Sequence, residues 1–423
     1  MKIALWAALF LCLEGGRGEA VGVPRNPVSG GTSGAQAGSD VSVSFRDLKK
    51  AVRVPFDLYY NLVVVSVRVN GKGPFPFGVD TGASGSFVEE SLLDAMGVQT
   101  AGTTDASGAG SSSYQVKKIP HLIFSFDGGL EVSTAHAIAL SWMGMAHGGG
   151  RMLYGAIGHD VLKNFVVQID YQRKRMTLYA PDAFHYSDRG TAFPMTFQSD
   201  FDPQIDGLVN VPGKPAIPAR LTLDTGGGGT VLSTPFVTEN HILESVGKTL
   251  ASPTHGVGNG ESKDILGRIT SLSIGPYVLH NPLVELSHDT VGSFANPTLG
   301  INLGGDILSR FTVIVDYARQ KLILEPNSHL SDPFLSDASG IVLRGEGDDF
   351  KTLTVWVIVP ASPADQAGLK EGDIITAMDG RPASDYSLWE VKQMFRESGR
   401  THRLNMQRGD RAFTCVLKLR SLI

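Results

Sequence analysis

The chain has 423 residues, of which 42% are hydrophobic and 19% charged, with 50 glycines and a net charge of −5. This length allows about two to four domains with their own cores, and the composition excludes a wholly disordered chain. The slightly negative net charge excludes a broad basic surface for nucleic acid.

Residues 1–20 have the pattern of a signal peptide. Lys2 precedes an apolar run at 3–13, and small residues precede Val21, which is the order of regions in an export signal. The run is too short to span a bilayer, so no stable membrane span is expected. Residues 21–40, rich in Gly, Ser and Pro, are expected to form a flexible leader. Once the signal is removed, Cys415 is the only cysteine, so no internal disulfide is expected.

Residues 41–187 are predicted to form a first strand-rich lobe. A buried strand at 61–69 ends in a turn at 70–73, and a second strand at 75–79 leads into Asp80. A short helix is expected at 89–96, because acidic residues occupy its first turn.

Residues 188–327 are predicted to form a second lobe with the same order of elements. A half-buried strand at 220–223 leads into Asp224. Thr234 is expected to cap a helix that begins with Pro235 and runs toward Glu244. Since both lobes have many short strands and few helices, the sequence predicts a mainly β fold.

The two lobes share a sequence repeat. Asp224 follows Asp80 by 144 positions, and Asp306 follows Asp160 by 146. The repeated stretches include Val79-Asp80-Thr81-Gly82-Ala83-Ser84 with Leu223-Asp224-Thr225-Gly226-Gly227, and Gly155-Ala156-Ile157-Gly158 with Ile301-Asn302-Leu303-Gly304. One fold unit therefore occurs twice, with one Asp-Thr-Gly in each copy.

Residues 328–339 are expected to be a polar linker, and residues 340–423 a small α+β unit. Strands are predicted at 352–359 and 373–378. Ser362 and Pro363 begin a short helix, and a second, amphipathic helix is predicted at 388–397. Two strands at 403–407 and 414–419 complete the unit.

The duplicated Asp-Thr-Gly predicts a pair of acids. Two similar lobes packed about a pseudo-twofold axis bring a turn near that axis against its own copy. Asp80 and Asp224 would then lie within a few ångströms and share one proton. The ionised acid can take a proton from water while the protonated acid polarises a carbonyl, which hydrolyses an amide without metal or cofactor. The alternative is a pair of structural turns.

The segment from about Val41 to Pro326 resembles the aspartic protease superfamily of pepsins and retropepsins. The resemblance implies a bilobal β-barrel fold with Asp80 and Asp224 as catalytic residues, Thr81 and Thr225 in interlocked hydroxyl bonds, and Gly82 and Gly226 in the active-site turns. The hairpin with Gly108, Gly110 and Tyr114 is a candidate flap over the cleft.

This sequence departs from the pepsin pattern at three positions. Ala83 and Gly227 stand where pepsins usually have Ser or Thr, and Asn302 replaces an apolar residue. The run of four glycines at 226–229 predicts a loose second turn, which would blunt catalysis.

The third unit resembles a bacterial, circularly permuted PDZ domain. The likeness rests on Ser362-Pro363-Ala364, Glu371-Gly372-Asp373-Ile374-Ile375 and Asp379-Gly380. It implies that Gly340, Ile341, Val342 and Leu343 hold the carboxylate of a peptide C-terminus, by strand addition to a sheet edge. Val391 and Met394 either line the pocket for the last side chain or belong to the core.

Other motifs favour structural roles. Asp160 and Asp306 each follow a glycine and precede a short apolar segment, so we expect them to cap helices. His147-Gly148-Gly149-Gly150 is similar to a lipase oxyanion loop, but no Gly-x-Ser-x-Gly accompanies it. The 11 histidines have no metal-ligand spacing, so no metal site is expected.

Together these patterns predict an exported aspartic endopeptidase of the bacterial periplasm or exterior. Its substrate is a protein or peptide, it needs no cofactor, and its PDZ domain binds peptide C-termini for recruitment or regulation. The alternative is an inactive peptide-binding scaffold built on protease-like lobes.

Overall fold

The computed structural model describes residues 5–6, 12–13, 41–46, 50–109, 111–141, 143–187, 189–199, 201–255 and 261–423. Most of the predicted signal peptide, the whole predicted leader at 21–40, and Gly110 lie outside these residues. Below, residues 41–187 are called the first lobe, residues 188–327 the second lobe, and residues 335–423 the PDZ unit.

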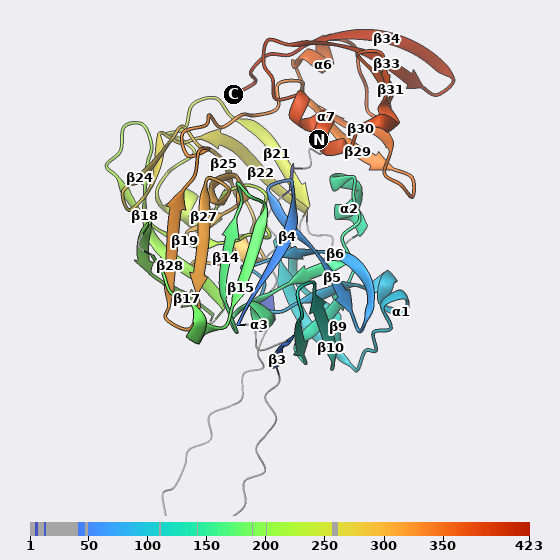
Figure 1. The fold of residues 1–423 in the computed structure, drawn as a ribbon. Helices are drawn as coiled ribbons and strands as arrows, with labels where there is room; N and C mark the ends of the chain where they lie inside the picture. The colour runs from blue at the N-terminus through green and yellow to red at the C-terminus, as the bar shows by residue number, and fades with distance from the viewer. Residues whose placement is uncertain are drawn as a thin grey trace, which may run out of the picture.

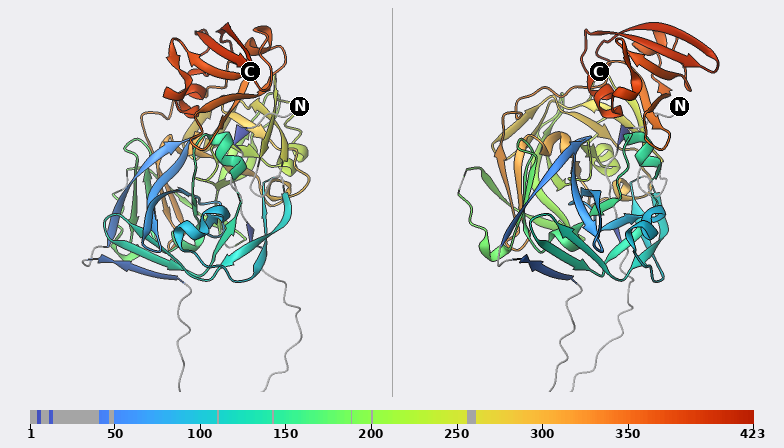
Figure 2. Two further views of the ribbon diagram at one scale, coloured as in Figure 1. Left: turned by 90° about the vertical axis from the view of Figure 1, so that its right-hand side faces the viewer. Right: turned by 45° about the vertical axis from the view of Figure 1, so that its right-hand side comes forward.

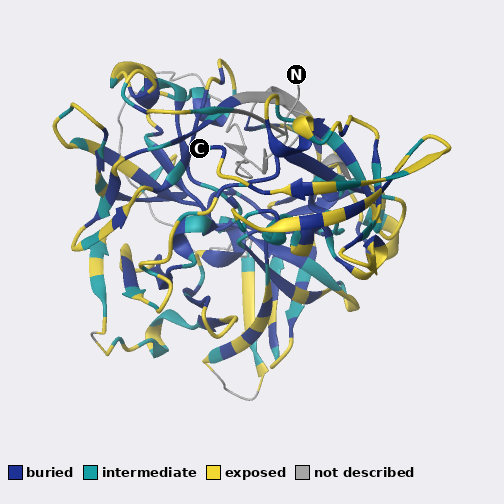
Figure 3. Cartoon of the chain, turned by 90° about the horizontal axis from the view of Figure 1, so that it is seen from above, coloured by how far each residue is buried: buried dark blue, intermediate teal, exposed yellow. Residues whose placement is uncertain are grey.

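Strands of the described residues form three sheets, so the prediction of a mainly β fold is confirmed. The two lobes lie side by side, and the PDZ unit sits on one end of them (Figures 1 and 2). Viewed from above, buried backbone gathers at the centre and exposed segments lie mainly at the periphery (Figure 3).

The first lobe is a strongly bent sheet around an apolar core. Its strand β4 alternates buried and exposed residues, whereas β5 begins with four buried residues in succession. The strands are β3 (Val41–Phe45), β4 (Ala51–Tyr59), β5 (Leu62–Val69), β6 (Lys72–Val79), β7 (Phe87–Glu89), β8 (Thr103–Gly108), β9 (Ser111–Ile119), β10 (Leu122–Phe126), β11 (Leu130–Thr134), β12 (Ala137–Leu140), β13 (Gly155–Ile157), β14 (Val166–Asp170) and β15 (Arg175–Tyr179). Its helices are η2 (Glu90–Leu92), α1 (Leu93–Met96), α2 (Met143–Gly149), α3 (His159–Leu162) and η3 (Pro181–Ala183).

The second lobe repeats this plan with a separate sheet. Its strands are β16 (Thr191–Pro194), β17 (Thr196–Gln198), β18 (Asp202–Asn210), β19 (Ile217–Leu223), β20 (Val231–Leu232), β21 (Leu250–His255), β22 (Glu261–Arg268), β23 (Ser271–Ile274), β24 (Tyr277–His280), β25 (Leu283–Leu286), β26 (Ile301–Leu303), β27 (Phe311–Asp316) and β28 (Lys321–Pro326). Its helices are α4 (Thr234–Glu239), η5 (Ser293–Ala295) and α5 (Gly305–Leu308).

Strands from both lobes join in one antiparallel sheet beneath the centre of the molecule. Its order is β4-β15-β14-β27-β28-β16, and the central pair β14 and β27 places Gln168 opposite Ile314. Because these two strands are equivalent in the repeat, a pseudo-twofold axis passes between them. The repeat in the sequence is therefore a repeat in space.

The PDZ unit has its own sheet and core. Its strands are β29 (Ile341–Glu346), β30 (Thr352–Ile358), β31 (Ile374–Met378), β32 (Arg381–Pro382), β33 (Thr401–Arg408) and β34 (Arg411–Lys418), and its helices are α6 (Pro363–Gln366), η6 (Ala383–Asp385) and α7 (Leu388–Met394). Val391 is buried in the core and Met394 packs against it. Ser362 caps α6 as predicted, and Ser387 with Glu390 forms a capping box on α7.

The predicted helix of the second lobe differs in both its cap and its length. Ser233, not Thr234, is the N-cap of α4, because the Ser233 hydroxyl accepts from the backbone of Phe236. The helix ends at Glu239 rather than running to Glu244, since Asn240 and His241 leave helical geometry. Among the residues that the structure describes, every helix is too short or too polar to cross a membrane.

Candidate active site

Each Asp-Thr-Gly turn begins where a buried strand ends. Asp80 follows β6 and Asp224 follows β19, and a parallel neighbour, β13 or β26, runs beside each strand. The backbone N–H of Asp80 donates to Ile157 (2.9 Å), and that of Asp224 donates to Leu303 (3.0 Å). Both side chains are buried, with at most 1% of their surface exposed. The strand pairs therefore hold two acids at matching positions near the pseudo-twofold axis.

The two turns are tied together by their threonines. The Thr81 hydroxyl donates to the Leu223 carbonyl (2.7 Å), and the Thr225 hydroxyl donates to the Val79 carbonyl (2.6 Å). Each hydroxyl also accepts the backbone N–H of the other threonine, at 3.1 Å in both cases. The structure thus brings together both predicted threonines, in a reciprocal set of four buried hydrogen bonds.

The glycines of the turns face the acids of the opposite lobe. The Gly82 N–H donates to its own Asp80 (2.9 Å), and the Gly226 N–H donates to Asp224 (2.8 Å). A Cβ added at Gly226 would lie 2.3 Å from the Asp80 Cγ, and one added at Gly82 would lie 3.1 Å from the Asp224 Cγ. Only glycine therefore lets each turn approach the opposite carboxyl group this closely.

Burial raises the pKa of both acids, and the charge of Asp224 raises that of Asp80 further. The pKa of Asp80 is raised well above its usual range, first by burial and then by the nearby charge of Asp224. Burial also raises the pKa of Asp224, to about 6, although hydrogen bonds from Asn302 and Gly226 oppose the rise. The pair is therefore suited to hold one proton, with Asp80 the protonated member and Asp224 the ionised one.

Asn302 creates this asymmetry. Its Nδ2 donates to Asp224 Oδ2 at 2.6 Å, and its side chain is fully buried. The equivalent position in the first lobe is Ala156, which has no donor, and among the described residues Asp80 Oδ2 has no hydrogen-bond partner. The sequence marked Asn302 as a departure from the family, but only the parallel pairing of β19 and β26 reveals its contact with the acid.

A third buried carboxyl group lies near the pair and was not singled out in the sequence. Asp202, at the start of β18, is 1% exposed, and its Oδ1 has no partner in the described part of the chain. Burial raises the pKa of Asp202 well above its usual range, and the charge of Asp224 adds to this effect. No motif precedes Asp202, so its position is visible only in the folded chain.

Asp160 and Asp306 are not the helix caps that their sequence context predicts. Gly158 and Gly304 are the N-caps of α3 and α5, and neither cap has a side-chain hydrogen bond. Asp160 instead accepts from the N–H and hydroxyl of Ser86 (2.8 and 2.7 Å), while Asp306 accepts from the Thr230 hydroxyl (2.7 Å). Since Ser86 and Thr230 each follow an Asp-Thr-Gly turn, both acids brace the segment leaving that turn.

The four-glycine run is packed rather than loose. Asn61 Nδ2 donates to the Gly228 carbonyl (2.9 Å), and a Cβ added at Gly228 would lie 2.5 Å from the Tyr60 carbonyl oxygen. The turn at Tyr60 and Asn61 thus inserts from the first lobe into the second. Within the run at 226–229, Gly226 and Gly228 are therefore glycine because the opposite lobe approaches them closely.

The candidate flap is a hairpin that reaches the second lobe. Strands β8 and β9 pair around its tip, with Gly108 opposite Ser111 and Tyr114 opposite Ala106. Ala109 at the tip is buried in a cluster with three residues of the second lobe: Val231, Phe294 and Leu299. Two short strands from the N-terminal end, β2 (Cys12–Leu13) and β1 (Leu5–Trp6), pair with β8 and with β21.

In the PDZ unit, the predicted carboxylate-binding residues begin β29. The N–H groups of Ser339 and Gly340 donate to Asp337 (2.9 and 2.6 Å), and that of Ile341 donates to the Ser339 hydroxyl (2.9 Å). Ile341, Val342 and Leu343 are buried, and a role of this loop in peptide binding stays a prediction.

Comparison with known proteins supports a protease-like part and a PDZ part. Residues 65–148 match a family model described as aspartyl protease, and residues 335–419 match one described as PDZ domain. The first match contains Asp80 and its turn but ends before Asp224. The chain therefore carries an aspartyl protease-like domain and a C-terminal PDZ domain.

Individual relatives cover only part of the chain. It is 25% identical over 134 residues to a protein of Synechocystis sp. (strain ATCC 27184 / PCC 6803 / Kazusa) named as serine protease HhoA, covering 31% of this chain and 27% of that one. A solved structure titled photosystem II D1 C-terminal processing protease matches with 23% identity and a TM-score of 0.19, over 21% of this chain and 23% of that one. This chain thus spans about a quarter of the length of either relative.

Proposed function

We propose that this chain is an exported aspartic endopeptidase in which Asp80 and Asp224 activate a water molecule. The observation that carries the proposal is the pair of buried turns locked by Thr81 and Thr225, which sets two acids of perturbed pKa against each other. Perturbed acids that face each other in this way are typical of catalytic sites.

The proposed reaction follows from the protonation states of the pair. Ionised Asp224 takes a proton from water as the water oxygen attacks the peptide carbonyl carbon, and protonated Asp80 gives its proton to the carbonyl oxygen. The tetrahedral intermediate then collapses. Asp224 gives its proton to the departing amine nitrogen as the C–N bond breaks, and Asp80 takes a proton from a hydroxyl of the intermediate, which becomes the new carboxyl group. Asn302 keeps Asp224 ionised, so it is a positioning residue rather than a catalytic one.

The relative named as a serine protease does not supply this mechanism. The match covers only 27% of that protein, and one fold accompanies many unrelated chemistries. We assign the PDZ domain a role in binding peptide ends, and the two lobes the role of peptide hydrolysis.

The test is replacement of each acid by its amide. Purified Asp80→Asn and Asp224→Asn are each expected to lose at least about a thousandfold in kcat for peptide cleavage, because either change removes the shared proton or its acceptor. Thermal unfolding of both variants checks that they fold. Cleavage that continues undiminished in either variant contradicts the mechanism. Binding and inhibition by a pepstatin-type inhibitor would support the enzyme, whereas peptide binding without turnover in the parent chain would favour an inactive scaffold.

A further inference from the structure

The groove between β29 and α7 of the PDZ unit contains a piece of the first lobe. This piece, residues 147–150, is called the groove segment below. Nδ1 of His147 donates to the Gly345 carbonyl of β29 (2.9 Å), and Nζ of Lys392 in α7 donates to the Gly148 carbonyl (3.0 Å). Figure 1 shows α2, whose last residues belong to the segment, lying directly beneath β29. Both walls of the groove therefore hold the segment.

The glycines of the segment are required by this fit. Gly150 has φ +68°, and a Cβ added there would lie 2.6 Å from the Leu388 Cβ of α7. On the other wall, a Cβ added at Gly345 would lie 3.0 Å from the Gly150 Cα. Backbone from the first lobe thus fills the space between strand and helix. This packing accounts for a His-Gly-Gly-Gly motif that the proposed reaction does not use.

The groove segment is also connected to both Asp-Thr-Gly turns through a few intervening residues. The Tyr59 hydroxyl donates to the Gly149 carbonyl, and the Tyr60 ring packs on Trp389 with centroids 4.5 Å apart. The next residue, Asn61, donates to Gly228 in the second turn. Farther along the chain, β13 follows the segment, and its Ile157 carbonyl accepts the N–H of Asp80.

The remainder of the same groove opens into a cavity of about 590 Å³. The start of β29 (Ile341 and Val342) lines it, whereas the far end of β29 contacts the groove segment. In the same way Gln393 of α7 and Arg396 just after the helix line the cavity, whereas Leu388 contacts the segment. The cavity and the groove segment are therefore consecutive parts of one groove.

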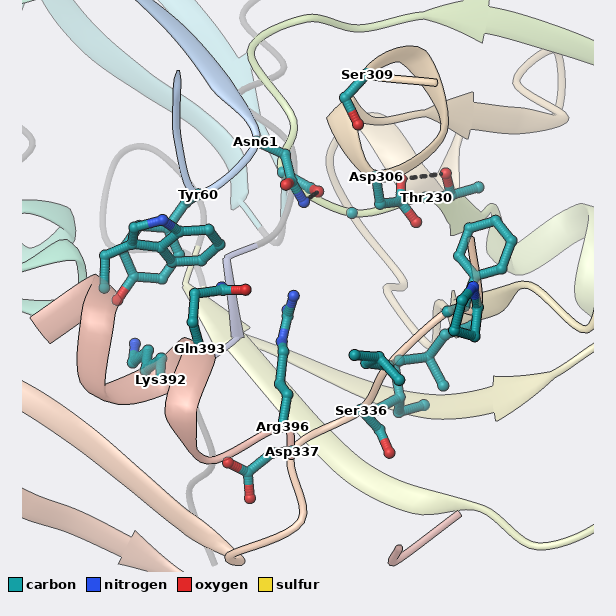
Figure 4. A pocket seen from close by; sticks show the side chains of 18 of the residues that line it. Tyr60, Asn61, Thr230, Asp306, Ser309, Ser336, Asp337, Lys392, Gln393 and Arg396 are labelled. Carbon is teal, nitrogen blue, oxygen red and sulfur yellow. Dashed lines mark hydrogen bonds between the residues drawn. The ribbon is translucent and has the colours of Figure 1, made fainter. Parts of the chain in front are cut away.

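The polar groups of the cavity suit an anionic end of a peptide. Figure 4 shows Lys392 and Gln393 from α7 and Arg396 just after it on one side, with Asp337 beside Arg396, and Asp306 and Thr230 of the second lobe across from them. Among the described residues, Gln393 Nε2 is buried without a hydrogen-bond partner. Apolar residues make up much of the remaining wall: Leu266, Leu283, Phe334, Ile341, Val342 and Val359.

We propose that the groove segment is an internal occupant of the PDZ groove, and that the carboxyl-terminal end of an extended peptide displaces it. The peptide carboxylate would meet Gln393 and Arg396, its last side chain would enter the apolar part of the cavity, and its backbone would add to β29. A peptide longer than the cavity must run toward Gly345, where the segment lies. The two occupants therefore exclude each other.

Displacement reduces activity, a consequence that rests on the proposed peptidase function. The docked segment holds Tyr59 and Tyr60, and through Asn61 it supports a catalytic turn made largely of glycine. Loss of that support loosens the turn, so a saturating peptide is expected to lower kcat about tenfold, within the usual range of coupling between sites. The PDZ domain then acts as a regulator rather than a tether for substrate.

The experiment uses the full chain with hexapeptides that end in Val or Leu, each with a free or an amidated carboxyl terminus. Calorimetry is expected to show binding of the free-acid peptides, with the amides at least about tenfold weaker because charge-assisted bonds are lost. Hydrogen exchange of the amides at 146–150 is expected to speed up when a free-acid peptide binds.

Two matched glycine variants isolate the groove segment. Gly150→Val places a side chain against Leu388, and Gly102→Val imposes similar backbone strain (φ +70°) where nothing lies within 4 Å. Gly150→Val is expected to bind the free-acid peptides about tenfold tighter, because the internal competitor is gone, and Gly102→Val is expected to bind as the parent does. His147→Ala, which removes one hydrogen bond, is expected to act in the same direction if Gly150→Val does not fold.

Two results would overturn the proposal: equal affinity in the parent and the groove-segment variants, or peptide binding with unchanged exchange at 146–150. Neither measurement depends on turnover. A chain that binds peptide and releases the segment but cleaves nothing would refute the peptidase function alone.

Discussion

The surroundings of Asp80 and Asp224 share a backbone and differ in side chains. Each acid has a parallel strand beside it, a threonine below it and a glycine of the opposite lobe in front of it. In the second lobe, however, Asn302 donates to the carboxylate from beside Thr222, whereas Ala156 and Gly78 occupy the matching places in the first.

This difference between the lobes separates two effects that a fully symmetric site could not separate. One effect brings the acids together, and the other gives them different pKa values. Symmetric backbone contacts bring the acids together, and one asymmetric side chain decides which of them stays ionised. A hydrogen bond to the charged form of an acid favours ionisation, so a single donor is enough to assign the roles.

The largest expected difference concerns the two glycines that face the acids. Gly226→Ala would place a Cβ 2.3 Å from the Asp80 Cγ and push that carboxyl group aside, so kcat/KM should fall about a hundredfold or more. Gly82→Ala leaves 3.1 Å to the Asp224 Cγ, and a small shift accommodates it, with a loss below about tenfold. Peptide cleavage by folded variants measures both effects, and equal losses would contradict the geometry.

Substitution of the two threonines tests the contacts that are the same in both lobes. Thr81→Val and Thr225→Val each leave a buried carbonyl and a buried N–H unpaired, so each should reduce the free energy of unfolding by about 2–4 kcal/mol. Denaturant unfolding measures this change. Thr→Ser at either position keeps the hydroxyl and serves as the control. A loss of stability at only one of the two positions would mean that the hydrogen bonds of the two threonines are not equivalent.

The smallest and most specific effect concerns Asn302. Since the proposed reaction needs Asp224 ionised, kcat/KM should fall as the pH drops below the pKa of Asp224, about 6. Asn302→Ala removes the donor to the charged form, so this acidic limb should move up by about one pH unit, or about 1.4 kcal/mol.

The reciprocal change, Ala156→Asn, should lower the pKa of Asp80 and move the basic limb down, because Gly78 leaves room beside it. The readout in both cases is the pH profile of peptide cleavage. If activity drops by the same factor at every pH in Asn302→Ala, the residue has a packing role only.

Much of this arrangement could be predicted from local patterns. The repeated Asp-Thr-Gly located both turns, and apolar runs and alternation located the strands that lead into them and several strands of the PDZ unit. Pairings at the pseudo-twofold axis followed from the repeat alone, because two copies of one unit have few ways to pack together.

The remaining features depend on contacts between distant segments. Asp160 and Asp306 precede apolar segments as helix caps do. Each nevertheless accepts a hydrogen bond from a hydroxyl group more than seventy residues earlier in the chain. The glycines at 226–229 signal a flexible turn when considered alone, and only the insertion of Tyr60 and Asn61 shows why a side chain is excluded at Gly228. The secondary-structure propensity of a segment does not reveal which distant segments of the chain lie against it.

The threonine lock has a consequence for the ancestry of the chain. A half-length ancestor with one Asp-Thr-Gly could have completed the same four bonds only by pairing with an identical copy of itself. In that homodimer any new residue would appear on both sides at once, so an asparagine beside one acid alone was unattainable. In a single chain the two copies can differ, and Asn302 at the position equivalent to Ala156 is a difference that two identical subunits could not have.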